Sequence, residues 1–522
     1  MKFVHLVVNS NYIITIALFL GSFFIYSYNL EGQPWHGDEI TYLGWAGNYV
    51  QLIKNGDFDN PCLKSLDSCN LLYHLPAFGL TYSHIRNLLI GLPMIAENKD
   101  SGNFYNWSCY WDCYNHSKGP TIQEMTAGRF LSPFFGSLTI VISFVIGKIL
   151  FNKYVGISFS LLFLFYDLWV WYSRTIMTEV HYVFFSMLSL LFLLYAFKTE
   201  HLRIRYFIAS GVLFGLALSS KVLAVEFSVV FLVIVLFGSL SRRGTVSTND
   251  KRRVSITVLS IFVFFAVAAL SLFLTEPGFY QNPPKAILAM KGDMDNYNRD
   301  VWYIGYPTIH GIQMDRALAL FHYALFPSFI EKQVSNPHLN LSGNFSWTFP
   351  PTYSSVPLTM FFFLGFGWLV YNIRKFKNCL AELIILVWFI STFIFTLLIA
   401  RDFSLERYLL PFLISILFIA SYGFWNFMKN IPHIKTKVAF AVYFMFAHSV
   451  TAMSYWQKIY FSPGTMWVNP LHYGTLQDSF DNLCTLAVNI TFVGFLLYMM
   501  IIQFRQRTNY RVYDVTKNNR KS

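Results

Sequence analysis

The chain has 522 residues, of which 55% are hydrophobic and only 13% are charged. An average soluble domain carries roughly 25% charged residues, so this composition excludes an ordinary soluble protein and predicts a chain solvated mainly by lipid. The formal net charge of +12 does not indicate a nucleic-acid partner, because the basic residues lie in short segments between apolar runs and form no basic stripe on a soluble domain.

Apolar runs long enough to cross a bilayer recur along the whole chain. A spanning helix needs about 17 to 25 predominantly apolar residues, and we count about twelve such runs. Their expected ranges are 12–30, 130–150, 154–172, 180–197, 205–220, 223–240, 254–274, 356–373, 380–400, 408–427, 437–455 and 484–503. We therefore predict an all-α polytopic membrane protein in which residues 1–522 form a single domain, with the first run kept as a helix and not removed as a signal peptide.

The positions of Lys and Arg set the expected orientation, because cytoplasmic loops retain basic residues during insertion. With the N-terminus inside, the short inside loops hold most of the basic residues, such as the five between Arg242 and Arg253. Residues 504–522 are then a basic cytoplasmic tail, and both termini are cytoplasmic. A prokaryotic plasma membrane is favoured over the endoplasmic reticulum, because the sequence shows no retention signal.

Two long segments, 31–125 and 275–355, then lie outside, where water-soluble chemistry can occur. Loops of this length are usually functional or disordered, and their Trp, Tyr and Cys content disfavours disorder. The first holds four of the six cysteines, Cys62, Cys69, Cys109 and Cys113. Pairing in chain order is one of three disulfide connectivities, and a zinc site is the alternative. The two segments also hold the sequons at Asn106, Asn115, Asn340 and Asn344, which agree with this topology.

Two adjacent carboxylates, Asp38 and Glu39, follow the first span directly. At a membrane face such a pair is a candidate for base catalysis or cation binding. In the alternative interpretation, Asp38 caps a helix that runs from Glu39 to about Leu52. At the other end of the same loop, Lys118 and Arg129 bracket the return into the membrane. They are candidates for holding a phosphate, or they are cations that extend to the interface from helix ends.

Further charged residues fall in shorter connections on the same outside face. The turn after the third run contains Arg174, Glu179 and His181. Glu179 either joins the first loop's site, pairs with Arg174 or caps a helix, whereas His181 is expected to be packed or interfacial. Lys221 and Arg407 lie in two other outside connections and are candidates either for phosphate contact or for ordinary solvation at the interface.

Seven of these residues map to one side of the membrane. They are Asp38, Glu39, Lys118, Arg129, Glu179, Lys221 and Arg407. A carboxylate that deprotonates an acceptor hydroxyl and cations that receive a departing phosphate are the groups that glycosyl transfer from a lipid phosphate sugar requires.

These residues resemble the GT-C glycosyltransferases, in particular the branch of the dolichyl-phosphate-mannose protein mannosyltransferases and the aminoarabinose transferases. The resemblance rests on the Asp38-Glu39 pair, Lys118-Gly119-Pro120, the run from Arg129 (GRFLSPFFGSLTIVISFVIGKILF) through YSRTIMTE, GVLFGLALSSK ending at Lys221, and RYLLP from Arg407. It touches about half of the chain and implies a GT-C-like fold.

The resemblance also implies roles. Asp38 becomes the catalytic base or a metal-side carboxylate with Glu39 supporting it, and the second acidic position falls on Glu179. Lys118 takes the place of a lysine that faces the lipid phosphate, although Gly119 replaces the first proline of the family's Lys-Pro-Pro segment. The implied reaction is an inverting displacement that moves a sugar, mannose by family default, from a polyprenyl- or dolichyl-phosphate donor to a protein, lipid or glycan acceptor. The phosphate departs toward Lys118, Arg407 or a divalent cation.

Two other functional classes stay open at this point. A secondary transporter or lipid flippase also has about twelve helices with both ends inside, but transporters tend to show matching halves and charges near the bilayer midplane, and neither stands out here. A surface-glycan polymerase or ligase shares the lipid donor. The sequence does not distinguish the sugar, the acceptor or a metal requirement.

Overall fold

The computed structural model describes residues 2–33, 37–57, 60, 83–96, 120–198, 204–241, 250–276, 334–335, 346–347, 355–375, 379–399, 409–460, 488 and 490–498. Its longer elements, in chain order, are α1 (Lys2–Ser27), α2 (Gly37–Lys54), α6 (His84–Ala96), α8 (Ile122–Arg129), α9 (Leu131–Leu150), α10 (Lys153–Leu164), α11 (Asp167–Tyr172), α12 (Thr178–Lys198), α13 (Ile204–Ser220), the 3-10 helix η1 (Val222–Phe227), α14 (Ser228–Ser241), α15 (Asp250–Thr275), α18 (Val356–Arg374), α19 (Leu380–Ile399), α20 (Leu410–Lys429) and α21 (Ile434–Tyr460). The two-residue strands β1 (Val334–Ser335) and β2 (Ser346–Trp347) pair antiparallel.

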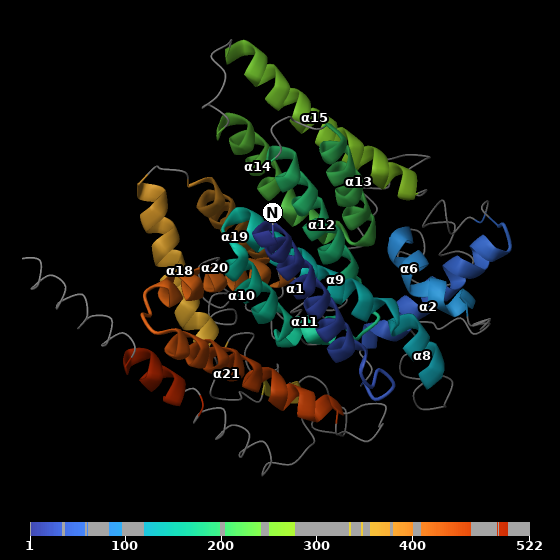
Figure 1. The fold of residues 1–522 in the computed structure, drawn as a ribbon. Helices are drawn as coiled ribbons and strands as arrows, with labels where there is room; N and C mark the ends of the chain where they lie inside the picture. Colours follow the sequence, from blue (N-terminus) through green and yellow to red (C-terminus); the bar gives the residue numbers. More distant parts are fainter. Residues whose placement is uncertain are drawn as a thin grey trace, which may run out of the picture.

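The predicted all-α architecture is confirmed, and the helices gather into one bundle with α2 and α6 at its edge (Figure 1). Six helical stretches in the described part of the chain are long and apolar enough to cross a membrane. They are Ile122–Leu150, Thr178–Phe197, Val258–Thr275, Val356–Arg374, Leu380–Leu397 and Leu410–Lys429. The chain is therefore a multi-pass membrane protein.

The predicted count of about twelve spans is not confirmed, partly because some apolar runs are divided. The run 154–172 is split between α10 and α11, and the run 223–240 starts as η1 before α14 begins. Four shorter apolar helices are present, at Asn11–Ser27, Lys153–Leu164, Ile204–Ser220 and Val222–Leu236. Hydropathy reports the apolar character of such a run but not where its backbone breaks.

Helix α20 lies at the centre of the bundle and α15 at its periphery. In the most apolar 18-residue stretch of α20, 89% is buried inside the protein, compared with 22% of the corresponding stretch of α15. The ring of Phe418 on α20 stacks on Phe159 of α10 at 4.3 Å and meets Trp388 of α19 edge-on at 6.3 Å. Exposed apolar side chains such as Phe262 on α15 are suited to contact lipid.

Small residues let the central helices approach closely. A Cβ added at Gly365 of α18 would lie 2.1 Å from the carbonyl oxygen of Ile419 on α20, and one at Gly423 would lie 2.2 Å from that of Phe361. Packing between helices in a membrane depends on such close contacts, because lipid provides no hydrophobic drive for association.

Candidate functional site

Helix α2 carries the predicted acidic pair and buries one of its faces. Its buried face contains Glu39, Leu43, Ala46 and Val50, residues three or four apart that share one side of a helix. The helix matches the one predicted from Glu39 to about Leu52. It begins at Gly37, so Asp38 lies in the first turn and does not precede the helix as a cap. The backbone of Asp38 is thus described, and its side chain lies outside the described part.

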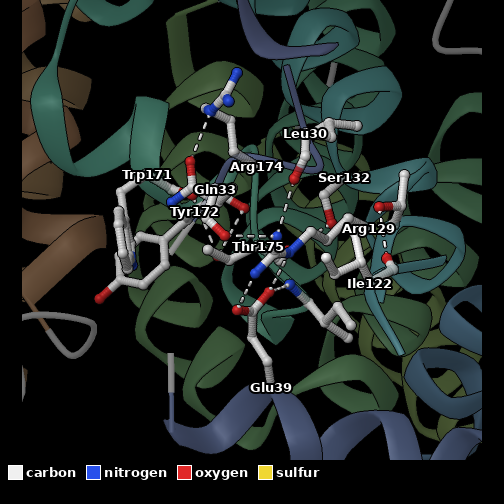
Figure 2. Close-up of polar contacts among 12 residues, drawn as sticks. Leu30, Gln33, Glu39, Ile122, Arg129, Ser132, Trp171, Tyr172, Arg174 and Thr175 are labelled. Atoms are coloured by element: carbon white, nitrogen blue, oxygen red, sulfur yellow. Dashed lines mark hydrogen bonds and ion pairs between the residues drawn. The ribbon is translucent and has the colours of Figure 1, made fainter. Parts of the chain in front are cut away.

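Glu39 forms a bidentate ion pair with Arg129, the last residue of α8. Arg129 Nε donates to Glu39 Oε1 at 2.9 Å and Nη2 donates to Oε2 at 2.7 Å. The two side chains are 0% and 1% exposed. Figure 2 shows the carboxylate of Glu39 extending from α2 to the guanidinium. Charge-assisted pairs with this fork geometry are among the strongest polar contacts in proteins.

The same ion pair joins four segments of the chain. Arg129 Nη1 donates to the carbonyl oxygens of Leu30 and Gln33, both at 3.0 Å, in the turn that follows α1. Glu39 Oε1 accepts the backbone N–H of Ile176 at 2.7 Å. Because the guanidinium is engaged by a carboxylate and two carbonyls, it fixes the start of α2 against the bundle. The phosphate contact predicted for Arg129 stays a prediction.

Arg174 holds the end of α1 from the other side. Its side chain is buried, Nε donates to Gln33 Oε1 at 2.8 Å, and Nη1 donates to the carbonyls of Tyr26 at 3.0 Å and Tyr28 at 2.7 Å. Basic side chains satisfy the last carbonyls of a helix and interact favourably with its dipole. Figure 2 shows Arg174 and Gln33 beside the Glu39–Arg129 ion pair.

Glu179, in the first turn of α12, pairs with Lys221, the residue between α13 and η1. Glu179 Oε1 accepts from Lys221 Nζ, and Oε2 accepts from Thr178 Oγ1 at 3.2 Å. The carboxylate is 0% exposed and the lysine 15% exposed. The ammonium also lies 5.8 Å from the ring centroid of Tyr182. The structure thus pairs Glu179 with Lys221, a partner that the predicted alternatives did not include.

The two pairs are connected through one short turn. Ile176, whose N–H is held by Glu39, lies three residues before Glu179, and Ser132 of α9 donates to the carbonyl of Thr175 at 2.8 Å. Both acid–base pairs are thus placed on the same side of the bundle, as the predicted topology requires. The juxtaposition of Glu39, Arg129, Glu179 and Lys221 defines the candidate site.

Two further buried charges lie next to this site and were missed by the sequence analysis. Arg86 on α6 is buried, its guanidinium lies 4.9 Å from the ring centroid of Tyr42 and 5.0 Å from that of Trp45, and Nη2 donates to Asn87 Oδ1 at 2.8 Å. Burial lowers the pKa of Arg86 to about 10, whereas Tyr42, Glu276 and Glu179 act in the opposite direction.

Glu276 is the second of these charges and directly follows α15. Its Oε2 accepts the N–H of Ser83 at 3.0 Å, and its Oε1 accepts the N–H of His84 at 3.1 Å and the hydroxyl of Ser219. Burial raises the pKa of Glu276 to about 8, against the opposing effects of these hydrogen bonds and of Arg86. The sequence signal was available: TEP follows an apolar run at the start of the second long outside segment, as GDE follows the run that precedes the first.

Other predicted features lie outside the described residues. Among the site residues these are Lys118 and Arg407. The four loop cysteines, the four sequons and the side chain of Asp38 lie outside as well.

His181 is buried and packs against Phe135 with ring centroids 5.3 Å apart. In the part of the chain that the structure describes, no group of three or more His, Cys, Asp or Glu side chains is arranged to hold a metal, and the divalent cation stays a prediction.

The sequence profile of the family described as dolichyl-phosphate-mannose-protein mannosyltransferase matches residues 121–270. This segment contains Arg129, Glu179 and Lys221. Over this part of the chain, the match confirms the resemblance to GT-C glycosyltransferases. A search among curated proteins gives no match.

Three solved structures have a partly similar arrangement. ArnT from Cupriavidus metallidurans in the apo state is 12% identical, with a TM-score of 0.43, 95% of this chain and 78% of that chain being covered. ArnT bound to undecaprenyl phosphate is 13% identical, with a TM-score of 0.43 and coverage of 95% and 77%. The archaeal oligosaccharyltransferase AglB from Archaeoglobus fulgidus, in complex with an inhibitory peptide and a dolichol-phosphate, is 12% identical, with a TM-score of 0.47 and coverage of 84% and 55%. This chain therefore spans about half the length of AglB, and all three TM-scores lie below 0.5.

Proposed function

We propose that the chain is a GT-C glycosyltransferase that moves a sugar from a polyprenyl-phosphate donor to an acceptor hydroxyl at the outer face of the membrane. The observation that carries the proposal is the family-profile match to residues 121–270, which includes three of the four residues in the two buried acid–base pairs. These pairs lie at the ends of apolar helices, where a lipid-anchored substrate would present its phosphate and its sugar.

In the proposed reaction, Asp38 takes the proton from the acceptor hydroxyl. The acceptor oxygen bonds to the anomeric carbon while the bond from that carbon to the phosphate oxygen breaks, and polyprenyl phosphate leaves with the electron pair. The anomeric configuration is inverted, because attack and departure occur on opposite sides. Proton removal by a positioned side chain contributes typically about 10² to 10⁴ in rate.

The ion pairs support this reaction in different ways. Glu39 and Arg129 are committed to each other and to backbone groups, so we assign them to positioning the first turn of α2, where Asp38 stands. Lys221 is the more accessible member of the second pair, so we assign it to the departing phosphate, with Glu179 orienting its ammonium. Lys118 and Arg407 are further candidates for phosphate contact. Preorganised cations at the position of developing charge are a major source of rate enhancement.

We further propose mannose as the sugar and a protein, lipid or glycan as the acceptor, with a divalent cation as an optional phosphate ligand. Residues 1–522 would form one domain, with 31–125 and 275–355 outside and 504–522 as a basic cytoplasmic tail. Both termini would be cytoplasmic, since this orientation leaves the acid–base pairs on the outside. The membrane would be a prokaryotic plasma membrane.

The proposal is tested with membranes that contain the protein and are incubated with radiolabelled polyprenyl-phosphate sugars. We expect a covalently labelled acceptor and free polyprenyl phosphate, with phosphate-linked mannose as the best donor. Uptake of free solute, or movement of intact donor between leaflets without a covalent product, would instead identify a transporter or flippase and would reject the enzyme. Products extended by repeated glycan units would identify a polymerase or ligase.

A further inference from the structure

We propose that Glu276 is a positioning residue: it clamps the packed helices α2 and α6 onto the membrane bundle and so sets the location of Asp38 relative to the Glu179–Lys221 pair. This inference deepens the proposed function and rests on it. The clamp has three parts, namely the N-terminus of α6, the end of α13 and the aromatic contact between α6 and α2.

The carboxylate of Glu276 covers the first turn of α6. It accepts the backbone N–H groups of Ser83 at 3.0 Å and His84 at 3.1 Å. The first N–H groups of a helix need acceptors from outside the helix, and Glu276 supplies them here. Ser83 adopts a left-handed backbone with φ of 66°, a conformation that is costly for a residue with a Cβ. Such an outlier persists when the surroundings determine it, and here both N–H groups are directed at one acidic side chain.

The same carboxylate reaches the cationic half of the site. Ser219, near the end of α13, donates its hydroxyl to Glu276 Oε1 and lies two residues before Lys221. The N–H of Lys221 in turn bonds to the carbonyl of Ala217 at 2.9 Å. Glu276 therefore ties α6 to the segment that carries the lysine paired with Glu179.

From α6, the contact continues to the helix that carries the predicted base. The guanidinium of Arg86 lies against both Tyr42 and Trp45 of α2, and the ring of His84 contacts that of Tyr49 in a tilted arrangement with centroids 4.9 Å apart. These aromatic residues follow Asp38 in α2 at four, seven and eleven residues. Figure 1 shows α6 beside α2, below the end of α15. A displacement of α6 would thus move α2 and, with it, the first turn that contains Asp38.

The charge state of Glu276 gives the clamp a measurable signature. Arg86 on α6 acts on Glu276 directly, and His84 donates its backbone N–H to it. Arg86 in turn interacts with Glu179 and His181 on α12, and Glu179 pairs with Lys221 after α13. Burial raises the pKa of Glu276 from 4.5 to about 8. A carboxyl with a raised pKa binds its proton more tightly in the docked state, so docking is strongest at low pH and weakens as pH rises through about 8. Arg86, with a pKa of about 10, stays charged over this range.

The test compares Glu276→Ala, Glu276→Gln and a matched control, Ser271→Ala, in purified full-length protein. Ser271 lies on α15 and donates to the carbonyl of Val212 at 3.1 Å, a hydrogen bond that joins α15 to α13 and does not involve α6. Hydrogen exchange is measured on peptides from α6 and α2, and sugar transfer is measured from pH 6.5 to 9. In Glu276→Ala we expect exchange in α6 to rise at least tenfold, about 1.4 kcal/mol, and kcat to fall while the donor KM changes little.

Glu276→Gln separates positioning from general structural damage. Its amide oxygen can still accept from His84 and Ser219, and it cannot ionise, so we expect near-normal protection of α6 and no fall of activity through pH 8. Wild type and Ser271→Ala should both show that fall. Wild-type exchange in α6 of Glu276→Ala, or a fall through pH 8 that persists in Glu276→Gln, overturns the inference. If wild type transfers no sugar, the proposed function fails while the exchange data still decide whether Glu276 clamps α6.

Discussion

The losses of stability from removing Glu39 and Arg129 singly should not add, because each single change leaves an unpaired buried charge and the double change leaves none. In Arg129→Gln, the Glu39 carboxylate remains 0% exposed without its bidentate partner, and a buried charge left in this way typically costs about 3–5 kcal/mol. The carbonyls of Leu30 and Gln33 also lose a cationic donor. We therefore expect a loss near the upper end of that range.

The double variant Arg129→Gln with Glu39→Gln leaves no uncompensated charge, so its loss should be smaller than the sum of the two single losses by about 0.5–3 kcal/mol, the usual size of coupling between contacting residues. Equilibrium unfolding of the detergent-solubilised protein measures the loss in Arg129→Gln, in Glu39→Gln and in the double variant. Glu124→Gln is the matched control: Glu124 lies on the same helix α8, its contact with Thr121 is exposed, and Gln also fits this capping box, so its loss should be below ~1 kcal/mol. Additive single losses, or an Arg129→Gln loss no larger than that of Glu124→Gln, would refute the reasoning.

The remaining predictions concern helix packing and the second ion pair. Gly423→Ala should destabilise the protein by about 1–3 kcal/mol, because its Cβ would lie 2.2 Å from the carbonyl oxygen of Phe361. Gly367→Ala is the control, because nothing lies within 4 Å of its added Cβ. Thermal unfolding in detergent compares the two variants, and equal losses would contradict the close crossing of α18 and α20. Glu179→Gln should lower kcat at least ~10-fold by releasing the Lys221 ammonium, as steady-state transfer would measure; unchanged kcat would remove Glu179 from the site.

Hydropathy predicted the class of fold and most helical ranges, because a membrane requires long apolar segments with internal hydrogen bonds. The predicted helix after Glu39 also formed, as α2 (Gly37–Lys54). The number of spans was less predictable, since the break between α10 and α11 leaves the apolar run intact in the sequence.

The site was predicted as a set of residues on one face, but not as particular pairs. Glu39 and Arg129 are 90 residues apart and Glu179 and Lys221 are 42 apart, so only tertiary packing determines which carboxylate meets which cation. Local spacing instead suggested Arg174 as a partner for Glu179, whereas the donors of Arg174 bond to carbonyls at the end of α1. Glu276 was overlooked because a single carboxylate after a span is only a weak local signal, and its partners Ser83 and His84 lie 193 and 192 residues away in the sequence.

The central claim is that Asp38, held in place by the pairs around it, removes the proton that allows sugar transfer. The most direct measurement is single-turnover release of polyprenyl phosphate by purified protein in lipid nanodiscs, comparing wild type with Asp38→Asn and with Asp57→Asn, an exposed residue just after α2. We predict that Asp38→Asn inserts normally and loses transfer by at least ~10²-fold, while Asp57→Asn matches wild type. Full release by Asp38→Asn would contradict the account.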